Sequence, residues 1–450
     1  MLINSGDTAW MLTSTALVLM MTLPGLALFY AGLVRHKNVL ATAMQTFATT
    51  CVVTVLWVIV GYSLAFTNGG TLGTWIGDFS RLLFRGADLN NAFVLGAGSA
   101  SPSTTTIPES VFMMFQMTFA IITPALIAGA FADRMKFSAL LLFMGAWSLV
   151  VYAPIAHWVW HPNGFLATAG VLDFAGGTVV HISAGVAGLV TALVMGPRLG
   201  HPLDQARPYS VLQSLIGASL LWVGWFGFNA GSALAAGGRA GMAMAATMTA
   251  AGAAGLAWMG VEWFRRGKPT VTGILSGSVA GLVAITPAAG FVDLEGALAM
   301  GALGGALCYV SCTAVKDFFR YDDALDCFGI HGVAGILGAI LTGVFATSAV
   351  TGGSDPLGWV DGHSAQILVQ LKGIGITIAW SVVATWVLLT AVHALAGGLR
   401  VSAEVEEQGL DHALHGEGLG AHEVHVPYAP PLSPEAPLET LGTEDQPAKA

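Results

Sequence analysis

The chain has 450 residues, of which 55% are hydrophobic, 10% are charged and 58 are glycine. Soluble domains average about 25% charged residues and about 45–50% apolar residues including glycine, so this composition predicts a polytopic membrane protein and excludes nucleic-acid-binding, disulfide-rich and disordered proteins. The net charge of −9 belongs to residues 401–450, which hold ten acidic residues and one lysine, whereas residues 1–400 hold sixteen of each sign.

Stretches without Asp, Glu, Lys or Arg mark the expected membrane spans, because a span needs about 20 apolar residues. We therefore expect an all-α membrane protein with eleven transmembrane helices. The stretches are residues 8–34, 38–66, 110–132, 137–159, 174–197, 208–238, 240–261, 269–292, 296–315, 327–354 and 373–399.

Basic residues indicate the orientation of the spans, because cytoplasmic loops carry an excess of Lys and Arg. One set of loops and ends carries thirteen basic residues, whereas the other set carries only Arg81, Arg85 and Arg239. An odd number of spans places the termini on opposite sides. We therefore predict an N-terminus outside the cell and a C-terminus in the cytoplasm.

An acidic residue precedes a histidine at the same spacing in two distant spans. Asp173 lies eight residues before His181 in the fifth span, and Asp323 lies eight residues before His331 in the tenth. Five spans in each half would give the two halves opposite orientations. This pattern predicts an inverted 5+5 repeat followed by a long last helix, with a site between the halves near the membrane midplane.

The two histidines are candidates for lining a path, because ionisable side chains at membrane depth are costly and usually face a bundle interior or water. The alternative is that His181 and His331 are hydrogen-bonded packing residues. Asp173 could cap helix N–H groups, act as a fixed negative charge, or do both. No carboxylate or Cys completes a ligand set at helical spacing around the histidines, so we expect no metal site.

Aromatic residues gather at the predicted outer ends of three spans. Phe119 lies in FQMTF, Trp160 in HWVWHP, and Trp225 and Phe228 precede Ser232 in GWFGFNAGS. Each could simply anchor the membrane interface. Ring faces with a hydroxyl at one mouth would also suit a small cation. The residues alone thus indicate a transporter or channel with a narrow, partly apolar path.

Over residues 8–417 the sequence resembles the ammonium transporter (Amt/Mep/Rh) family, and Trp160 favours the Amt branch. The segments that carry the resemblance are PGLALFYAGLVRHKNVL, FQMTFAIITPALIAGAFADRMKFSA, IAHWVW, LDFAGGTVVHI, GWFGFNAGS and DDALDCFGIHGVAGILG. The family fold is an eleven-helix monomer in a homotrimer, each subunit with its own pore. The resemblance implies a multi-pass protein of the cell inner membrane that binds ammonium or methylammonium, uses no cofactor and is not an enzyme.

The resemblance also implies roles at the outer mouth. Trp160, Phe119 and Ser232 would form a recruitment site for ammonium. Phe119 and Phe228 would be a stacked pair that closes the pore mouth, and Asp173 would stabilise the recruitment site without direct contact. Met117 departs from the family pattern, which has a small residue beside this pair.

Below the mouth, the resemblance implies that His181 and His331 line the pore and hydrogen-bond to each other, and that Trp225 is a wall residue. Ammonium would lose its proton and ammonia would pass, with or without a separate proton relay. The alternative function is an ammonium sensor that signals through its tail.

The chain is expected to divide into a transporter domain (1–400), a cytoplasmic regulatory segment (401–417) and an acidic, Pro-rich extension (418–450) that we expect to be disordered. The EEQGLD and HGE pieces of residues 401–417 resemble a family segment that docks across subunits. We expect this segment to pack on the basic inner loops. In the family, the same face receives a PII-type signalling protein.

Overall fold

The structure is a computed structural model that describes residues 2–202 and 207–419, so the predicted extension lies almost wholly outside the described residues. Within the compact unit that ends at Gly418, ten described helices are long and apolar enough to cross a membrane. A shorter apolar helix, Val271–Ile285, stands where the eighth span was predicted. The all-α membrane fold is therefore confirmed, while the count of eleven spans and the orientation of the termini stay predictions.

The first half of the chain contains helices and one small β-ribbon, which lies in the long connection of residues 67–108. In chain order, these elements are α1 (Ser5–Met20), α2 (Ala27–Leu33), α3 (Val39–Leu56), α4 (Tyr62–Phe66), β1 (Val94–Leu95), β2 (Ser103–Thr104), α5 (Glu109–Ile127), α6 (Phe137–Trp147), α7 (Ala153–Trp160), α8 (Phe165–Thr168) and α9 (Ser183–Met195).

The second half of the chain contains helices α10 to α19, the last two of which are short helices in the tail. These elements are α10 (Val211–Gly231), α11 (Gly238–Arg266), α12 (Val271–Ile285), α13 (Leu294–Val310), α14 (Lys316–Phe319), α15 (Val333–Phe345), α16 (Ser348–Thr351), α17 (Ala365–Leu395), α18 (Ala403–Gln408) and α19 (Leu410–His415).

Several membrane-length helices contain a π-helical turn. Pro24 lies in one of them, η1 (Met21–Leu26), which connects α1 to α2, because proline has no N–H to continue the α-helical pattern. Two further turns open helices: η8 (Gly177–Ile182) leads into α9, and η10 (Phe328–Gly332) leads into α15. They carry His181 and His331, so the two histidines occupy similar local settings.

Several predicted boundaries differ from the structure, and two of the differences have an evident physical reason. Helix α17 begins at Ala365 rather than at residue 373, because Lys372 interrupts the charge-free stretch without interrupting the helix. A lysine near a helix end can extend its amine to the interface. Helix α12 ends at Ile285 rather than at residue 292, because Pro287, two residues after Ile285, cannot continue the helix.

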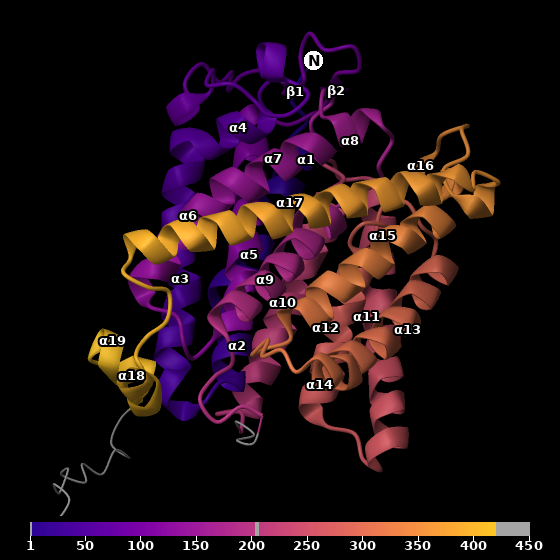
Figure 1. The fold of residues 1–450 in the computed structure, drawn as a ribbon. Helices are drawn as coiled ribbons and strands as arrows, with labels where there is room; N and C mark the ends of the chain where they lie inside the picture. Colours follow the sequence, from indigo (N-terminus) through magenta and orange to yellow (C-terminus); the bar gives the residue numbers. More distant parts are fainter. Residues whose placement is uncertain (1, 203–206, 420–450) are drawn as a thin grey trace, which may run out of the picture. The chain divides into compact units, whose positions relative to one another are not determined.

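Figure 1 shows α17 running obliquely across the bundle, and it packs against α6, α9 and α15. The β-ribbon lies at the end of the bundle near the N-terminus, and α18 and α19 lie near the opposite end beside α3. Inside the bundle, the two halves approach closely at Gly185, where an added Cβ would lie 2.2 Å from the backbone nitrogen of Gly332. Such small residues allow tight helix packing in membranes.

Candidate functional site

Aromatic residues from α5, α7 and α10 meet at one place. The rings of Phe119 and Phe228 stack, with centroids 4.2 Å apart and planes at 27°. Trp160 meets Phe119 edge-on, with centroids 5.7 Å apart and planes at 87°. The structure therefore brings together three residues that the sequence analysis placed at the predicted outer mouth.

A cavity of about 130 Å³ lies against these rings, and its wall includes Phe119, Trp160 and Ser232. Residues of both β-strands complete the wall, so the β-ribbon, which the sequence did not predict, covers the cavity. The Ser232 hydroxyl donates to the Phe228 carbonyl oxygen at 2.9 Å. Its own lone pairs therefore remain free to accept a hydrogen bond from a small cation.

Gln116 also lines this cavity, although the sequence analysis did not single it out. Its Oε1 atom is buried and has no hydrogen-bond partner within residues 2–202 and 207–419. A buried carboxamide oxygen is costly when unpaired, so it favours a hydrogen-bond donor in the cavity. The available signal was its position in FQMTF, almost one helical turn before Phe119.

Asp173 fixes the neighbourhood of the cavity without lining it. Its backbone oxygen accepts a hydrogen bond from the Trp160 indole at 3.0 Å, which orients that ring. Its carboxylate accepts from the four consecutive amides of residues 176–179, at 2.7–3.0 Å. Gly176 has φ +105°, a left-handed conformation that favours glycine. Asp173 thus holds the start of η8 in place.

The two histidines lie deeper in the bundle and face each other. Their Nδ1 atoms are 3.3 Å apart, and their rings are nearly parallel with centroids 5.3 Å apart. Trp225 stacks on His181 with centroids 5.4 Å apart, while its indole donates to Thr286 Oγ1 at 2.9 Å. His181 also lies 6.0 Å, between centroids, from Phe228. Rings therefore follow one another from Trp160 to His331.

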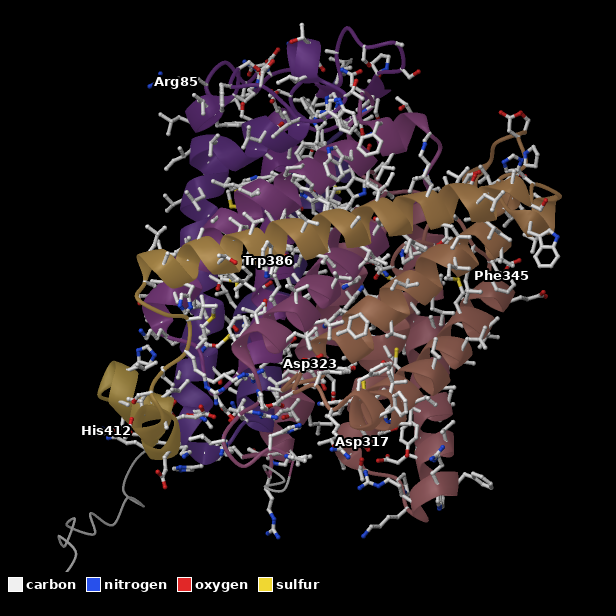
Figure 2. The ribbon with its side chains drawn as sticks, in the orientation of Figure 1. Arg85, Asp317, Asp323, Phe345, Trp386 and His412 are labelled. Carbon is white, nitrogen blue, oxygen red and sulfur yellow. The ribbon has the colours of Figure 1, made fainter. Side chains whose placement is uncertain are left out.

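A second cavity, of about 430 Å³, is lined by Ile330, the neighbour of His331. Its wall holds two carboxylates that are each paired with a cation: Arg266, also in the wall, lies 3.7 Å from Glu262, and Lys316 lies 2.7 Å from Asp326. Figure 2 shows Asp317, which lies in sequence between the lining residues Thr313 and Ala324, at the end of the bundle opposite Arg85. This cavity was not predictable from the sequence, because its lining comes from segments that lie far apart in the chain, among them α11, α12 and residues 324–326.

The membrane-length helices and the line of buried rings between two cavities define a polytopic membrane transport protein. Comparison with known proteins identifies the family. The family model described as "Ammonium Transporter Family" matches residues 9–419. An ammonium transporter of Aquifex aeolicus is 52% identical over 416 residues, which cover 92% of this chain and 93% of that protein.

Solved structures agree with this assignment. Mep2 of Saccharomyces cerevisiae is 38% identical, with a TM-score of 0.81 over 89% of this chain and 88% of that chain. A structure described as a sensor Amt protein is 26% identical, with a TM-score of 0.81 over 91% of this chain and 98% of that chain. The chain belongs to the ammonium transporter family. It is a multi-pass membrane transport protein and not an enzyme, as the resemblance implied, and an inner-membrane location is consistent with its bacterial and archaeal relatives.

Proposed function

We propose that the protein takes up ammonium at the aromatic cavity, removes its proton and conducts ammonia past the two histidines, with or without separate relay of the proton. One observation carries the proposal. The rings of Trp160, Phe119, Phe228, His181 and His331 follow one another from the wall of the first cavity to His331, whose neighbour Ile330 lines the second cavity.

Recruitment would use the ring faces and polar atoms of the cavity. A desolvated cation over an aromatic face gains about 2 kcal/mol. The Ser232 hydroxyl and the Gln116 carboxamide can each accept a hydrogen bond from ammonium, which has four N–H groups to donate. Asp173 would act indirectly, because backbone amides already occupy its carboxylate.

Selectivity would arise below the stacked phenylalanines. Transfer of a bare cation into an apolar pore carries an ideal cost of tens of kcal/mol, whereas neutral ammonia costs far less. Potassium has no proton to release and no hydrogen bond to donate, so it cannot use this route. The imidazoles can accept hydrogen bonds from ammonia and exchange protons. The second cavity, whose wall carries polar groups, would then receive the ion that forms again on the far side.

Transport by the purified protein in liposomes on a solid-supported membrane tests the proposal. Addition of ammonium should produce a current, and an equal addition of potassium should produce none. If ammonia alone crosses, the current is absent, but the liposome interior becomes alkaline faster than in protein-free liposomes. No current together with alkalinisation at the protein-free rate, or an equal current with potassium, would overturn the proposal.

The alternative function is a sensor, and two observations favour keeping it. The chain resembles a structure described as a sensor Amt protein, and α18 and α19 of the tail dock on the bundle. A sensor would bind ammonium without measurable flux in the same liposome assay.

We also propose a homotrimer and a PII-type partner at the predicted cytoplasmic face, both carried over from the family resemblance. The proposed division of the chain is a transporter domain, a regulatory segment and an extension, with boundaries after residues 400 and 417. Light scattering in detergent tests the trimer, and co-purification with a PII-type protein tests the partner.

A further inference from the structure

We propose that Gln370, on the oblique helix α17, is a positioning residue for the aromatic cavity and for the helix that carries His181. The proposal rests on the function proposed above. Neither composition nor motif marked Gln370, and the residues named in the cavity wall come from other elements.

The Gln370 side chain uses its whole hydrogen-bonding capacity. Its Oε1 accepts from the Leu172 amide at 2.8 Å and from Gln366 Nε2 at 3.2 Å. Its Nε2 donates to the Leu172 carbonyl at 2.7 Å and to the Ala339 carbonyl at 3.1 Å. The residue is only 1% exposed. A buried carboxamide that is fully paired in four directions fixes the groups around it, because any displacement leaves a polar atom unpaired.

The position of Leu172 determines what Gln370 controls. Both backbone polar groups of Leu172 bind Gln370, and the next residue is Asp173. The Asp173 carbonyl orients the Trp160 indole, and its carboxylate holds the four amides at the start of η8. A shift of Leu172 would therefore move both the aromatic wall of the cavity and the turn that carries His181.

The fourth hydrogen bond of Gln370, to the Ala339 carbonyl, reaches the other half of the molecule. Ala339 lies in α15, which continues from the turn that carries His331. Close packing supports the same arrangement: Ile374, one turn beyond Gln370, clusters with Ile182 and Ala339. An added Cβ at Gly373 would lie 3.1 Å from Val171, so the missing side chain lets α17 approach this segment. One side chain thus ties the Asp173 segment to the His331 helix.

A purely structural role would lower stability without changing affinity for ammonium, so the test needs a matched control. Thr385 lies on the same helix, is fully buried, and accepts a hydrogen bond from the Trp147 indole of α6 at 3.0 Å. Thr385→Val removes one buried hydrogen bond from α17 without touching Leu172. Gln370→Leu removes the four contacts at similar side-chain volume.

Ammonium-evoked currents in liposomes should separate the two variants. We expect Gln370→Leu to raise the half-saturating ammonium concentration by about three- to tenfold, the range of one lost hydrogen bond, while Thr385→Val stays within about twofold. If Gln370 acts through Trp160, the variant with both Gln370→Leu and Trp160→Leu should be no weaker than Trp160→Leu alone. Unchanged half-saturation in Gln370→Leu, or additive losses in the double variant, would overturn the inference while leaving the proposed function intact.

Hydrogen exchange measured by mass spectrometry gives a readout that does not depend on transport. The amides of residues 176–179, which bind Asp173, should exchange faster in Gln370→Leu than in wild type, and Thr385→Val should leave them unchanged. Equal exchange in all three proteins would overturn the inference. If the three proteins show the expected differences in exchange but the wild-type protein shows no ammonium flux, the proposed function is overturned and the inference about Gln370 stands.

Discussion

The Nδ1 atoms of His181 and His331 lie 3.3 Å apart, although 150 residues separate them in the chain. At this distance one nitrogen donates and the other accepts, so the two neutral rings adopt opposite tautomers. One Nε2 is then a donor and the other an acceptor, which gives the pair a direction. His181 Nε2 has no partner within the described part of the chain, so it is available to a molecule in the path.

Replacement of either histidine by alanine should abolish selective ammonium conduction. His181→Ala or His331→Ala leaves an apolar path without the paired imidazoles that accept protons. The measurement is the ammonium-evoked current and the liposome pH, with potassium as the competing ion. Full ammonium flux with full exclusion of potassium in both variants would remove the role assigned to the pair.

Trp160→Leu should weaken recruitment of ammonium. The change removes the ring that faces the cavity, and affinity falls by about tenfold for each 1.4 kcal/mol of cation–π energy lost. The half-saturating concentrations of ammonium and methylammonium measure the effect.

Trp158→Leu is the matched control, because Trp158 lies on the same helix but packs against Phe165 and Trp380, away from the cavity. It should leave half-saturation unchanged. If the two tryptophan variants behave alike, Trp160 is an interfacial anchor rather than a recruitment residue.

The sequence predicted the helical fold and the residues at the two ends of the ring series, because these residues lie in long motifs with characteristic spacing. It did not reveal Gln370, whose partner Leu172 lies 198 residues away and leaves no local pattern. The π-helical turns under His181 and His331 were not predictable either, since their composition matches that of the adjoining α-helix. The roles of all these residues stay predictions.

Asp322 and Asp323 are neighbours with opposite electrostatic settings, and this predicts a pH dependence. Burial raises the pKa of Asp323 to about 6, although Lys316 partly opposes the shift. Figure 2 shows Asp323 within the lower part of the bundle. Despite its burial, Asp322 has its pKa held below the ordinary value by hydrogen bonds and charge from Arg198, which binds it at 2.8 and 2.9 Å.

For Asp323, the folded pKa lies above the unfolded value of about 4, so the folded protein binds a proton that the unfolded chain releases. The contribution of Asp323 to stability is therefore full below about pH 4 and is lost as the pH rises through about 6. Asp322 contributes in the opposite sense, and its contribution is lost only as the pH falls below that window.

Thermal midpoints measured in detergent between about pH 4.5 and 7.5 test this difference. Asp323→Asn should flatten the decline that wild type shows with rising pH, whereas Asp322→Asn should lower the midpoint by a similar amount throughout. If the thermal midpoints of wild type and Asp323→Asn change with pH in parallel, the raised pKa of Asp323 is contradicted.

Two buried acids of the docked tail bind backbone amides and Arg400. Glu406 pairs with Arg400, a residue of the tail's own linker, at 2.6 Å and accepts from the Leu199 amide at 2.7 Å. Asp411 accepts from the amides of Leu40 and Ala41, at 3.1 and 2.7 Å. The tail thus lies against two basic inner segments, since Lys37 Nζ donates to the Glu407 carbonyl and Leu199 follows Arg198, but these two acids bind Arg400 and backbone amides rather than the basic side chains of those segments. Asp411 instead caps the N-terminus of α3, where a carboxylate is favoured by the helix dipole.

Deletion of residues 401–450 should reduce transport or release it from control by a PII-type partner, because the deletion removes the cap on α3 and the contact at Leu199. Asp411→Ala isolates the first of these contacts, and a lost cap costs about 1 kcal/mol of helix stability.

Deletion of 418–450 alone leaves both contacts in place and is the matched control, with transport expected to stay near the wild-type level. Liposome assays of the three variants, with and without the partner, provide the measurement. Wild-type behaviour of the longer deletion in both assays would leave the tail without a regulatory role, and Asp411 would then serve only to stabilise α3.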